Sequence, residues 1–201
     1  MRNLICFGEM LWDVLPTGKL PGGAPMNVAI HWQKRGNHAE LISRIGSDEL
    51  GTELLDFLHA MGLSSHLIQK DTEYPTSTVL ADTSNPSHVL YEIIQPVAWD
   101  FISISEVAIQ AVQQADFFVF GSLSARCSET RQTLLTLLKE AKCPVFDCNL
   151  RFVRAVNGNE SGFFLDNSQV MSKANNATPS VSTHTTLKPI SIEINHSEII
   201  L

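Results

Sequence analysis

The chain has 201 residues, a length that suffices for one good-sized domain. Its composition, 44% hydrophobic and 17% charged, is ordinary for a globular protein, and no apolar run approaches the ~20 residues of a membrane span. The formal net charge of −7 argues against nucleic acid as the main partner, because phosphate backbones are bound by basic surfaces. A nucleotide is not excluded, since it needs only a local anion site.

The N-terminus and the cysteines favour a cytoplasmic location. Residues 1–15 carry one basic residue and a short apolar stretch interrupted by Glu9, which is a poor match to a signal peptide. The four cysteines form no C-x-x-C pair, so we interpret them as thiols in a reducing compartment.

Apolar runs with glycine or proline stops predict alternating strands and helices over the first three quarters of the chain. Ser103 and Glu106 stand at capping-box spacing at the start of one helix, and Ser128 is the candidate cap of another. The predicted strands are 3–8, 10–16, 39–46, 117–122 and 144–149, and the predicted helices are 24–35, 51–62, 103–116 and 128–142.

This alternation predicts an α/β fold with a mostly parallel sheet and helices on its faces. Residues 77–82 and 88–94 depart from the rhythm, because two strand-like runs are joined directly by a polar turn. We therefore expect a small antiparallel addition to the α/β core. From Ala155 to Pro189, 14 of 35 residues are Asn, Ser or Thr, a composition typical of loops or disorder.

The stretch "LPGGAPMNVAIHWQKRG" (20–36) is the first candidate site. Gly22 and Gly23 allow a positive φ or a close approach of backbone to a ligand, and Asn27 in the following helical turn can both accept and donate hydrogen bonds. The alternative is a plain turn before a helix that has Pro25 in its first turn. Neither a G-x-G-x-x-G nor a P-loop pattern is present, which argues against a dinucleotide-binding oxidoreductase.

Asp13 is the second candidate, because a carboxylate within the apolar run "MLWDVL" is costly unless it is hydrogen-bonded. At a strand end it could bind two adjacent hydroxyls of a ligand. A solvent-facing strand residue is the alternative. The sequence alone leaves the two readings open.

The segment "FDCNLR" is the third candidate. Asp147, Asn149 and Arg151 alternate, so on an extended segment they share one face at the carboxyl end of the preceding strand. Ligands of open α/β sheets bind at that edge, and Arg151 would suit a phosphate or a carboxylate. A structural salt bridge is the alternative.

Taken together, these segments resemble the PfkB (ribokinase-like) carbohydrate kinases, and most closely the bacterial fructokinases. The N-terminal signature is carried by "FGEMLWDVLP", "PGGAPMNVAIHWQKRG" and "LISRIGSDELG", with the Gly-Gly, the Asn and the G-x-D-x-x-G in register. "PTSTVL", "YEIIQPVAWD", "ADFFVFGSL" and "VFDCNLR" continue the match to about Val153.

The resemblance implies a partial ribokinase-like three-layer α/β sandwich with a small β lid over a sugar site. Residues 1–154 would form the sugar-binding part, with lid strands at about 9–20 and 76–95, and residues 155–201 would form a divergent tail. Asp13 and Asn27 would bind sugar hydroxyls, and Gly22 and Gly23 would form the hinge between core and lid. Two chains could pair through their lid strands.

The implied chemistry is transfer of the γ-phosphate of ATP, as its Mg²⁺ complex, to a hydroxyl of a sugar such as fructose. Asn149 and Arg151 would lie near the transferred phosphate. The family also has an N-x-x-E motif near magnesium, and Asn195 and Glu198 fit its letters, although the Asn/Ser/Thr-rich segment stretches the spacing from Arg151.

The family's Gly-Ala-Gly-Asp loop, with its catalytic Asp, has no counterpart in the 201 residues. The catalytic residue is therefore unassigned. We expect either a fructokinase-type enzyme represented by a truncated or frameshifted chain, impaired in turnover, or a non-catalytic sugar-binding or regulatory protein on a shortened kinase scaffold.

Overall fold

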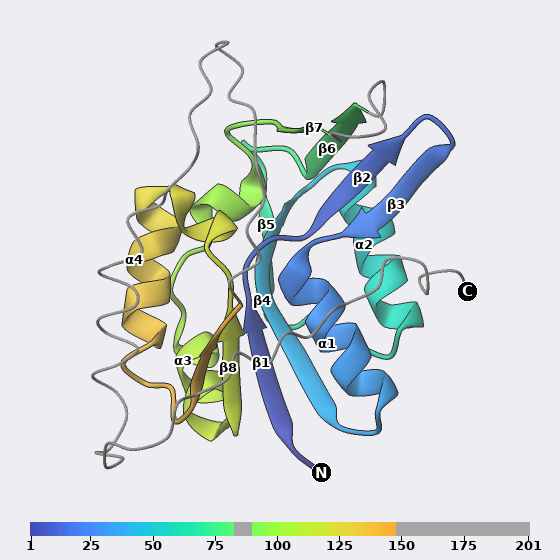
Figure 1. The fold of residues 1–201 in the computed structure, drawn as a ribbon. Helices are drawn as coiled ribbons and strands as arrows, with labels where there is room; N and C mark the ends of the chain where they lie inside the picture. The colour runs from blue at the N-terminus through green and yellow to red at the C-terminus, as the bar shows by residue number, and fades with distance from the viewer. Residues whose placement is uncertain (83–89, 148–201) are drawn as a thin grey trace, which may run out of the picture.

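A computed structural model shows three layers, with a parallel sheet between two pairs of helices (Figure 1). It describes residues 1–82 and 90–147. The sheet has the strand order β5-β4-β1-β8-β9, and every pairing within it is parallel. Its strands are β1 (Asn3–Phe7), β4 (His38–Gly46), β5 (Ile68–Asp71), β8 (Phe117–Phe120) and β9 (Pro144–Phe146). The predicted α/β fold with a parallel sheet is confirmed.

Strand β1 lies at the centre of this sheet and is buried on both faces. Leu4 and Cys6 pack with α1 and α2, whereas Ile5 and Phe7 pack with α3 and α4. A strand covered on both faces is apolar at every position rather than at alternate ones, which is why "LICF" is an uninterrupted apolar run. The hydrophobic effect therefore holds the three layers together from both sides of one strand.

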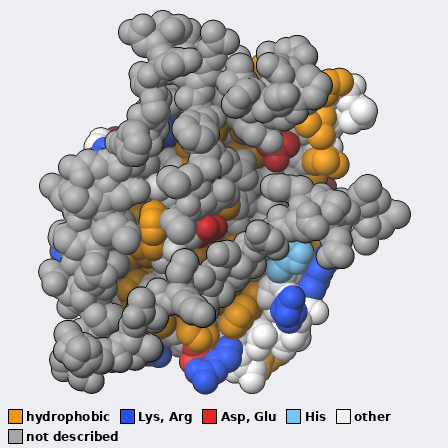
Figure 2. Space-filling view, in the orientation of Figure 1, with side chains coloured by type: hydrophobic (Ala, Val, Ile, Leu, Met, Phe, Trp, Pro, Cys, Tyr) orange, Lys and Arg blue, Asp and Glu red, His pale blue; other side chains and the backbone are white. Residues whose placement is uncertain are grey.

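The helices present apolar stripes to the sheet and polar faces to solvent. Helix α1 (Ala24–Lys34) buries positions three and four apart, including Met26, Ala29 and Ile30, and Figure 2 shows Lys, Arg and His side chains over its C-terminal half. The other helices are α2 (Glu49–Ala60), α3 (Glu106–Gln114) and α4 (Ser128–Leu137). No helix in the described part of the chain is long and apolar enough to cross a membrane.

A second, four-stranded sheet with the order β3-β2-β6-β7 lies beside the carboxyl edge of the main sheet (Figure 1). Strand β2 is antiparallel to β3 and parallel to β6, and β6 and β7 form the predicted antiparallel pair. The strands are β2 (Leu11–Leu15), β3 (Gly18–Gly22), β6 (Ser77–Asp82) and β7 (Leu90–Ile93).

Both helix caps predicted from the sequence are wrong. Helix α3 is capped by Ser105, whose Oγ accepts from the backbone N–H of Ala108 at 3.2 Å. Ser103 instead bonds to strand β5, since its N–H donates to Gln69 Oε1 at 2.9 Å. Ser128 lies inside the first turn of α4, and Cys127 occupies the cap position without a side-chain hydrogen bond. Ser103 therefore makes tertiary hydrogen bonds instead of capping α3.

Candidate functional site

The chain order of the main sheet reverses at β1. The chain runs outward from β1 to β4 and β5 and then returns to β8 and β9 on the other side of β1. In open α/β sheets the loops at such a switch point diverge and leave a crevice outside the carboxyl ends of the strands. The small sheet begins at this point, because β2 starts three residues after β1.

Asp13 and Gly22 lie in direct contact on the β2–β3 hairpin. In the antiparallel register Leu11 faces Gly22, and the Asp13 carboxylate reaches diagonally across to the same glycine. A Cβ atom on Gly22 would overlap Asp13 Oδ2 and would lie 2.9 Å from a methyl carbon of Leu11. The half-buried Asp13 carboxylate therefore depends on the missing side chain of Gly22 for its position.

A Gly22→Ala variant is expected to displace the Asp13 carboxylate and to lose about 1–3 kcal/mol of stability, because the added methyl overpacks a filled space. Urea unfolding measures the loss. Gly121→Ala is the matched control, since among the described residues a Cβ there meets only the Asp147 carbonyl oxygen, at 4.0 Å. Equal stability of the two variants would contradict the packing described for Gly22.

Gly23 joins the small sheet to helix α1 and requires glycine for two reasons. Its φ of +116° lies in a region that L side chains rarely adopt, and a Cβ would overlap the carbonyl oxygen of Glu9. Gly23 also forms the N-cap of α1, and its carbonyl accepts from the N–H of Asn27 at 3.0 Å. The Gly-Gly pair is thus both a helix start and a point of close backbone approach.

Asp13, Gly22 and Gly23 form a corner between the small sheet and helix α1. The close approach of the Glu9 carbonyl oxygen to Gly23 identifies Glu9 as a further residue of this corner. Glu9 is only 4% exposed, although it has a carboxyl side chain, and it lies two residues after the end of β1. Sequence reasoning noted Glu9 only as an interruption of an apolar run. A carboxylate inside a buried run was the available signal, and it is the same signal that identified Asp13.

Asn27 lies one turn into α1, and its side chain is half-buried. Neighbouring Pro25 and Met26 are buried against the core, whereas the Asn27 amide makes no hydrogen bond to the described part of the chain. Its donor and acceptor groups are thus available to a ligand. Asp13, Gly22, Gly23 and Asn27 come from one continuous stretch, and the hairpin folds the first three together.

At the other end of this edge, Asp147 follows β9, and its N–H donates to the Phe120 carbonyl at 2.9 Å. Burial, and secondarily the Asp147 carboxylate, raise the pKa of the Cys6 thiol far above its ordinary value, so this thiol is inert. Asn149, Arg151, Asn195 and Glu198 lie outside the described residues.

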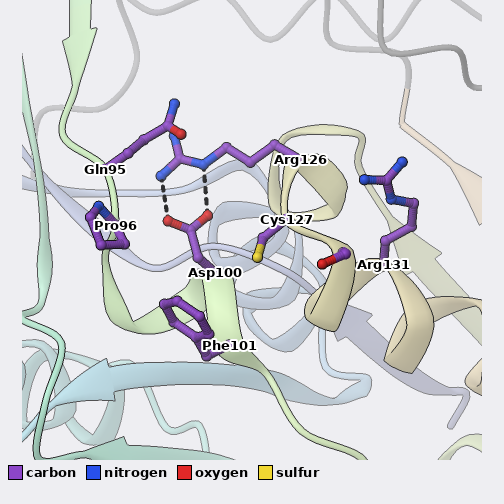
Figure 3. A pocket seen from close by; sticks show the side chains of 8 residues that line it. Gln95, Pro96, Asp100, Phe101, Arg126, Cys127 and Arg131 are labelled. Atoms are coloured by element: carbon purple, nitrogen blue, oxygen red, sulfur yellow. Dashed lines mark hydrogen bonds and ion pairs between the residues drawn. The ribbon is translucent and has the colours of Figure 1, made fainter.

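A separate open pocket of about 510 Å³ lies between the segment after β7 and the start of α4 (Figure 3). Two arginines, Arg126 and Arg131, line it, and Arg126 forms a two-pronged ion pair with Asp100. Of the predicted site residues that the structure describes, Asp13, Gly22, Gly23 and Asn27 do not line this pocket. Among the described residues, no group of three His, Cys, Asp or Glu side chains is arranged to hold a metal ion.

The fold is that of an open α/β sheet protein, a class in which ligands bind at the switch point. The model of the pfkB carbohydrate kinase family matches residues 3–174. The chain belongs to this family, and the family resemblance and the ribokinase-like fold predicted from the sequence are confirmed.

Individual relatives agree with the family. The uncharacterized sugar kinase PH1459 of Pyrococcus horikoshii is 32% identical over 146 residues, which are 70% of this chain and 46% of that protein. The fructokinase of Vibrio alginolyticus is 28% identical over 161 residues, 75% of this chain and 52% of that protein. The chain thus spans about half the length of these relatives.

Solved structures show the same fold. PH1459 superposes with a TM-score of 0.68 at 26% identity, covering 74% of this chain and 53% of that one, and it has also been solved in complex with ATP. The fructokinase of Halothermothrix orenii superposes with a TM-score of 0.67 at 23% identity, covering 80% of this chain and 62% of that one, a likeness of fold.

Proposed function

We propose that this chain supplies the sugar-binding part of a cytoplasmic carbohydrate kinase that transfers the γ-phosphate of ATP to a sugar hydroxyl. The observation that carries the proposal is the corner formed by Asp13, Gly22 and Gly23, which lies where the small sheet meets the carboxyl edge of the main sheet. Membership of the pfkB family supports the same activity.

The chemistry of this corner suits a polyol. The Asp13 carboxylate can accept hydrogen bonds from two neighbouring hydroxyls, and the Asn27 amide can donate to one hydroxyl and accept from another. Gly22 and Gly23 place backbone where a side chain would block the ligand. The small sheet acts as a lid that excludes water around the bound sugar, with the Gly-Gly pair as its hinge.

The substrate is a sugar such as fructose, and the phosphate donor is ATP. The sequence relationship to the Vibrio alginolyticus fructokinase supports the first, and the ATP complex of PH1459 supports the second. Phosphoryl transfer depends on positioning and on charge stabilisation, and the residues described here hold and orient the acceptor.

Mg²⁺ would neutralise phosphate charge in such a reaction, but the described residues provide no metal site. The phosphate-proximal roles of Asn149 and Arg151 and the metal-binding role of Glu198 remain predictions from the family resemblance.

The small sheet also supports pairing of two chains. Leu20 and Leu80 expose 53% and 46% of their surface on its strands, and exposed apolar side chains on a sheet favour association. A homodimer through the lid strands is therefore part of the proposal, and the molecular mass in solution tests it.

A sugar-binding protein without turnover is the second candidate. The 201 residues contain no Gly-Ala-Gly-Asp string of the kind that provides the family's catalytic Asp. Such a protein would bind a sugar equally well with and without MgATP.

Calorimetry of the 201-residue chain against a panel of hexoses, with and without MgATP, tests the proposed site, and ADP release tests turnover. We expect heat of binding with fructose and no fructose-dependent release of ADP from this polypeptide. Release of ADP would contradict the second candidate, and no heat with any sugar would contradict both.

A further inference from the structure

The G-x-D-x-x-G motif of the sequence, Gly46 to Gly51, forms a tight junction between three elements. Asp48 is the N-cap of α2, and its Oδ1 accepts from the N–H of Gly51 at 2.8 Å. A Cβ on Gly46 would lie 2.5 Å from Asp48 Oδ2, and one on Gly51 would overlap the Gly46 carbonyl oxygen. Both glycines are therefore required for the end of β4 and the start of α2 to approach this closely.

The same carboxylate binds Thr76, the residue directly before strand β6 of the small sheet. Asp48 Oδ2 accepts from the backbone N–H of Thr76 at 2.7 Å, and Asp48 Oδ1 accepts from Thr76 Oγ1 at 2.6 Å. Thr76 Oγ1 in turn accepts from the N–H of Gly46 at 2.9 Å. Thr76 is 4% exposed, so these hydrogen bonds are shielded from water.

Strand β6 starts directly after Thr76 and runs beside the strand that carries Asp13. In the parallel register Ser77 faces Leu11 and Val79 faces Asp13. The position of β6 relative to the core therefore sets the position of β2. A second contact fixes β2 to the same helical turn, because Trp12 Nε1 donates to the Leu50 carbonyl at 3.0 Å.

We propose that Asp48 is a positioning residue for the sugar site: through Thr76 it fixes the β6–β2 strand pair, and thereby the Asp13 carboxylate, to helix α2. This inference rests on the proposed function, since it assigns Asp48 a role in sugar binding without contact to the sugar. The predicted partners of the sugar are otherwise Asp13 and Asn27.

The role requires a carboxylate at this position. Burial acts to raise the pKa of Asp48, but hydrogen bonds from Thr76 and Gly51 outweigh it and hold the pKa below its ordinary value. Asp48 is therefore an anion at neutral pH, with both oxygens accepting. In asparagine one oxygen is replaced by an amide that cannot accept, so a donor would face the N–H of Thr76 or of Gly51.

The first test compares Asp48→Asn with Asp56→Asn, which removes the same charge from an exposed position of the same helix. Asp48→Asn is expected to raise the dissociation constant for fructose about tenfold, as expected for a loss comparable to one charge-assisted hydrogen bond. Asp56→Asn is expected to bind as the unaltered chain does. Binding is measured by calorimetry at a temperature where circular dichroism shows each variant to be folded.

The second test separates positioning from general stability. Thr76→Ser keeps the hydroxyl that Asp48 accepts from and is expected to retain sugar affinity, whereas Thr76→Val removes it and is expected to weaken affinity as Asp48→Asn does. Hydrogen exchange should accelerate in β2 and β6 of the weakened variants and remain unchanged in β1.

Unaltered fructose affinity in folded Asp48→Asn, or equal affinities of the two Thr76 variants, would overturn the inference. If the unaltered chain binds no hexose, the proposed function fails, and hydrogen exchange still decides whether Asp48 positions the strand of Asp13. Unchanged exchange in β2 and β6 of Asp48→Asn and Thr76→Val would then overturn it.

Discussion

Under the proposed function, Asp13→Ala is expected to raise the dissociation constant for fructose on the order of 100-fold, because it removes the carboxylate that we propose accepts from two sugar hydroxyls. The Asp13 carboxylate is placed for this role by its strand and by the absence of a side chain at Gly22. Calorimetry with the 201-residue chain measures the change. Asp13→Asn keeps one accepting oxygen, so its dissociation constant for fructose is expected to lie between those of the unaltered chain and Asp13→Ala.

Two controls accompany this variant. Asp56→Asn removes a carboxylate from an exposed position and is expected to leave fructose binding unchanged. The near-ultraviolet circular dichroism of Asp13→Ala should match that of the unaltered chain, which shows that the hairpin is folded. Wild-type affinity in a folded Asp13→Ala protein would remove Asp13 from the site.

Much of this fold could be predicted from the sequence because its core strands are covered on both faces. The apolar runs of β1 and β8 are uninterrupted, and helices α1 and α2 carry apolar stripes that are followed by Gly36 and Gly62. These signals are local, so a single sequence contains them. The same holds for the β6–β7 pair, whose two strand-like runs flank the polar sequence "TSNPS".

Elements that depend on tertiary contacts could not be predicted. Strand β3, with the sequence "GKLPG", has two glycines and a proline and therefore a low intrinsic strand preference. It forms because all five of its residues pair with β2. Ser103 matched a capping pattern, but its hydrogen bonds with Gln69 and Arg44 place it outside α3.

The candidate site was predictable only in part, because some of its signals are local in the sequence and others depend on tertiary contacts. Asp13 and the Gly-Gly pair could be singled out as unusual residues, one a charge in an apolar run and the other a flexible pair before a helix. Their contact depends on the hairpin register, which requires β3. The Asp48–Thr76 junction becomes visible only when residues distant in sequence are placed together.

The buried ion pair between Asp100 and Arg126 holds together the two short 3₁₀ helices η1 (Ala98–Phe101) and η2 (Leu123–Arg126) (Figure 3). Arg126 Nε and Nη2 donate to the two carboxylate oxygens at 2.7 and 2.8 Å, and both side chains are 5% exposed. The guanidinium also lies 3.9 Å from the ring centre of Trp99. Asp100 Oδ2 further accepts from the Val97 N–H at 3.0 Å.

Arg126→Ala is therefore expected to cost about 3–5 kcal/mol of unfolding free energy, because it leaves the Asp100 carboxylate buried without its ionic partner. Arg131→Ala, in the same pocket but without an ion pair among the described residues, is the control and is expected to change stability by less than about 0.5 kcal/mol. Urea unfolding at neutral pH compares the two.

The double variant Asp100→Leu with Arg126→Met separates the pair's own contribution from the penalty of an orphaned charge. Because it removes both charges, we expect it to be more stable than Arg126→Met alone, and comparison with Asp100→Leu and Arg126→Met should give a coupling on the order of 1–3 kcal/mol. A double variant as unstable as the sum of its single substitutions would show that packing against Trp99, rather than charge pairing, holds η1 and η2 together.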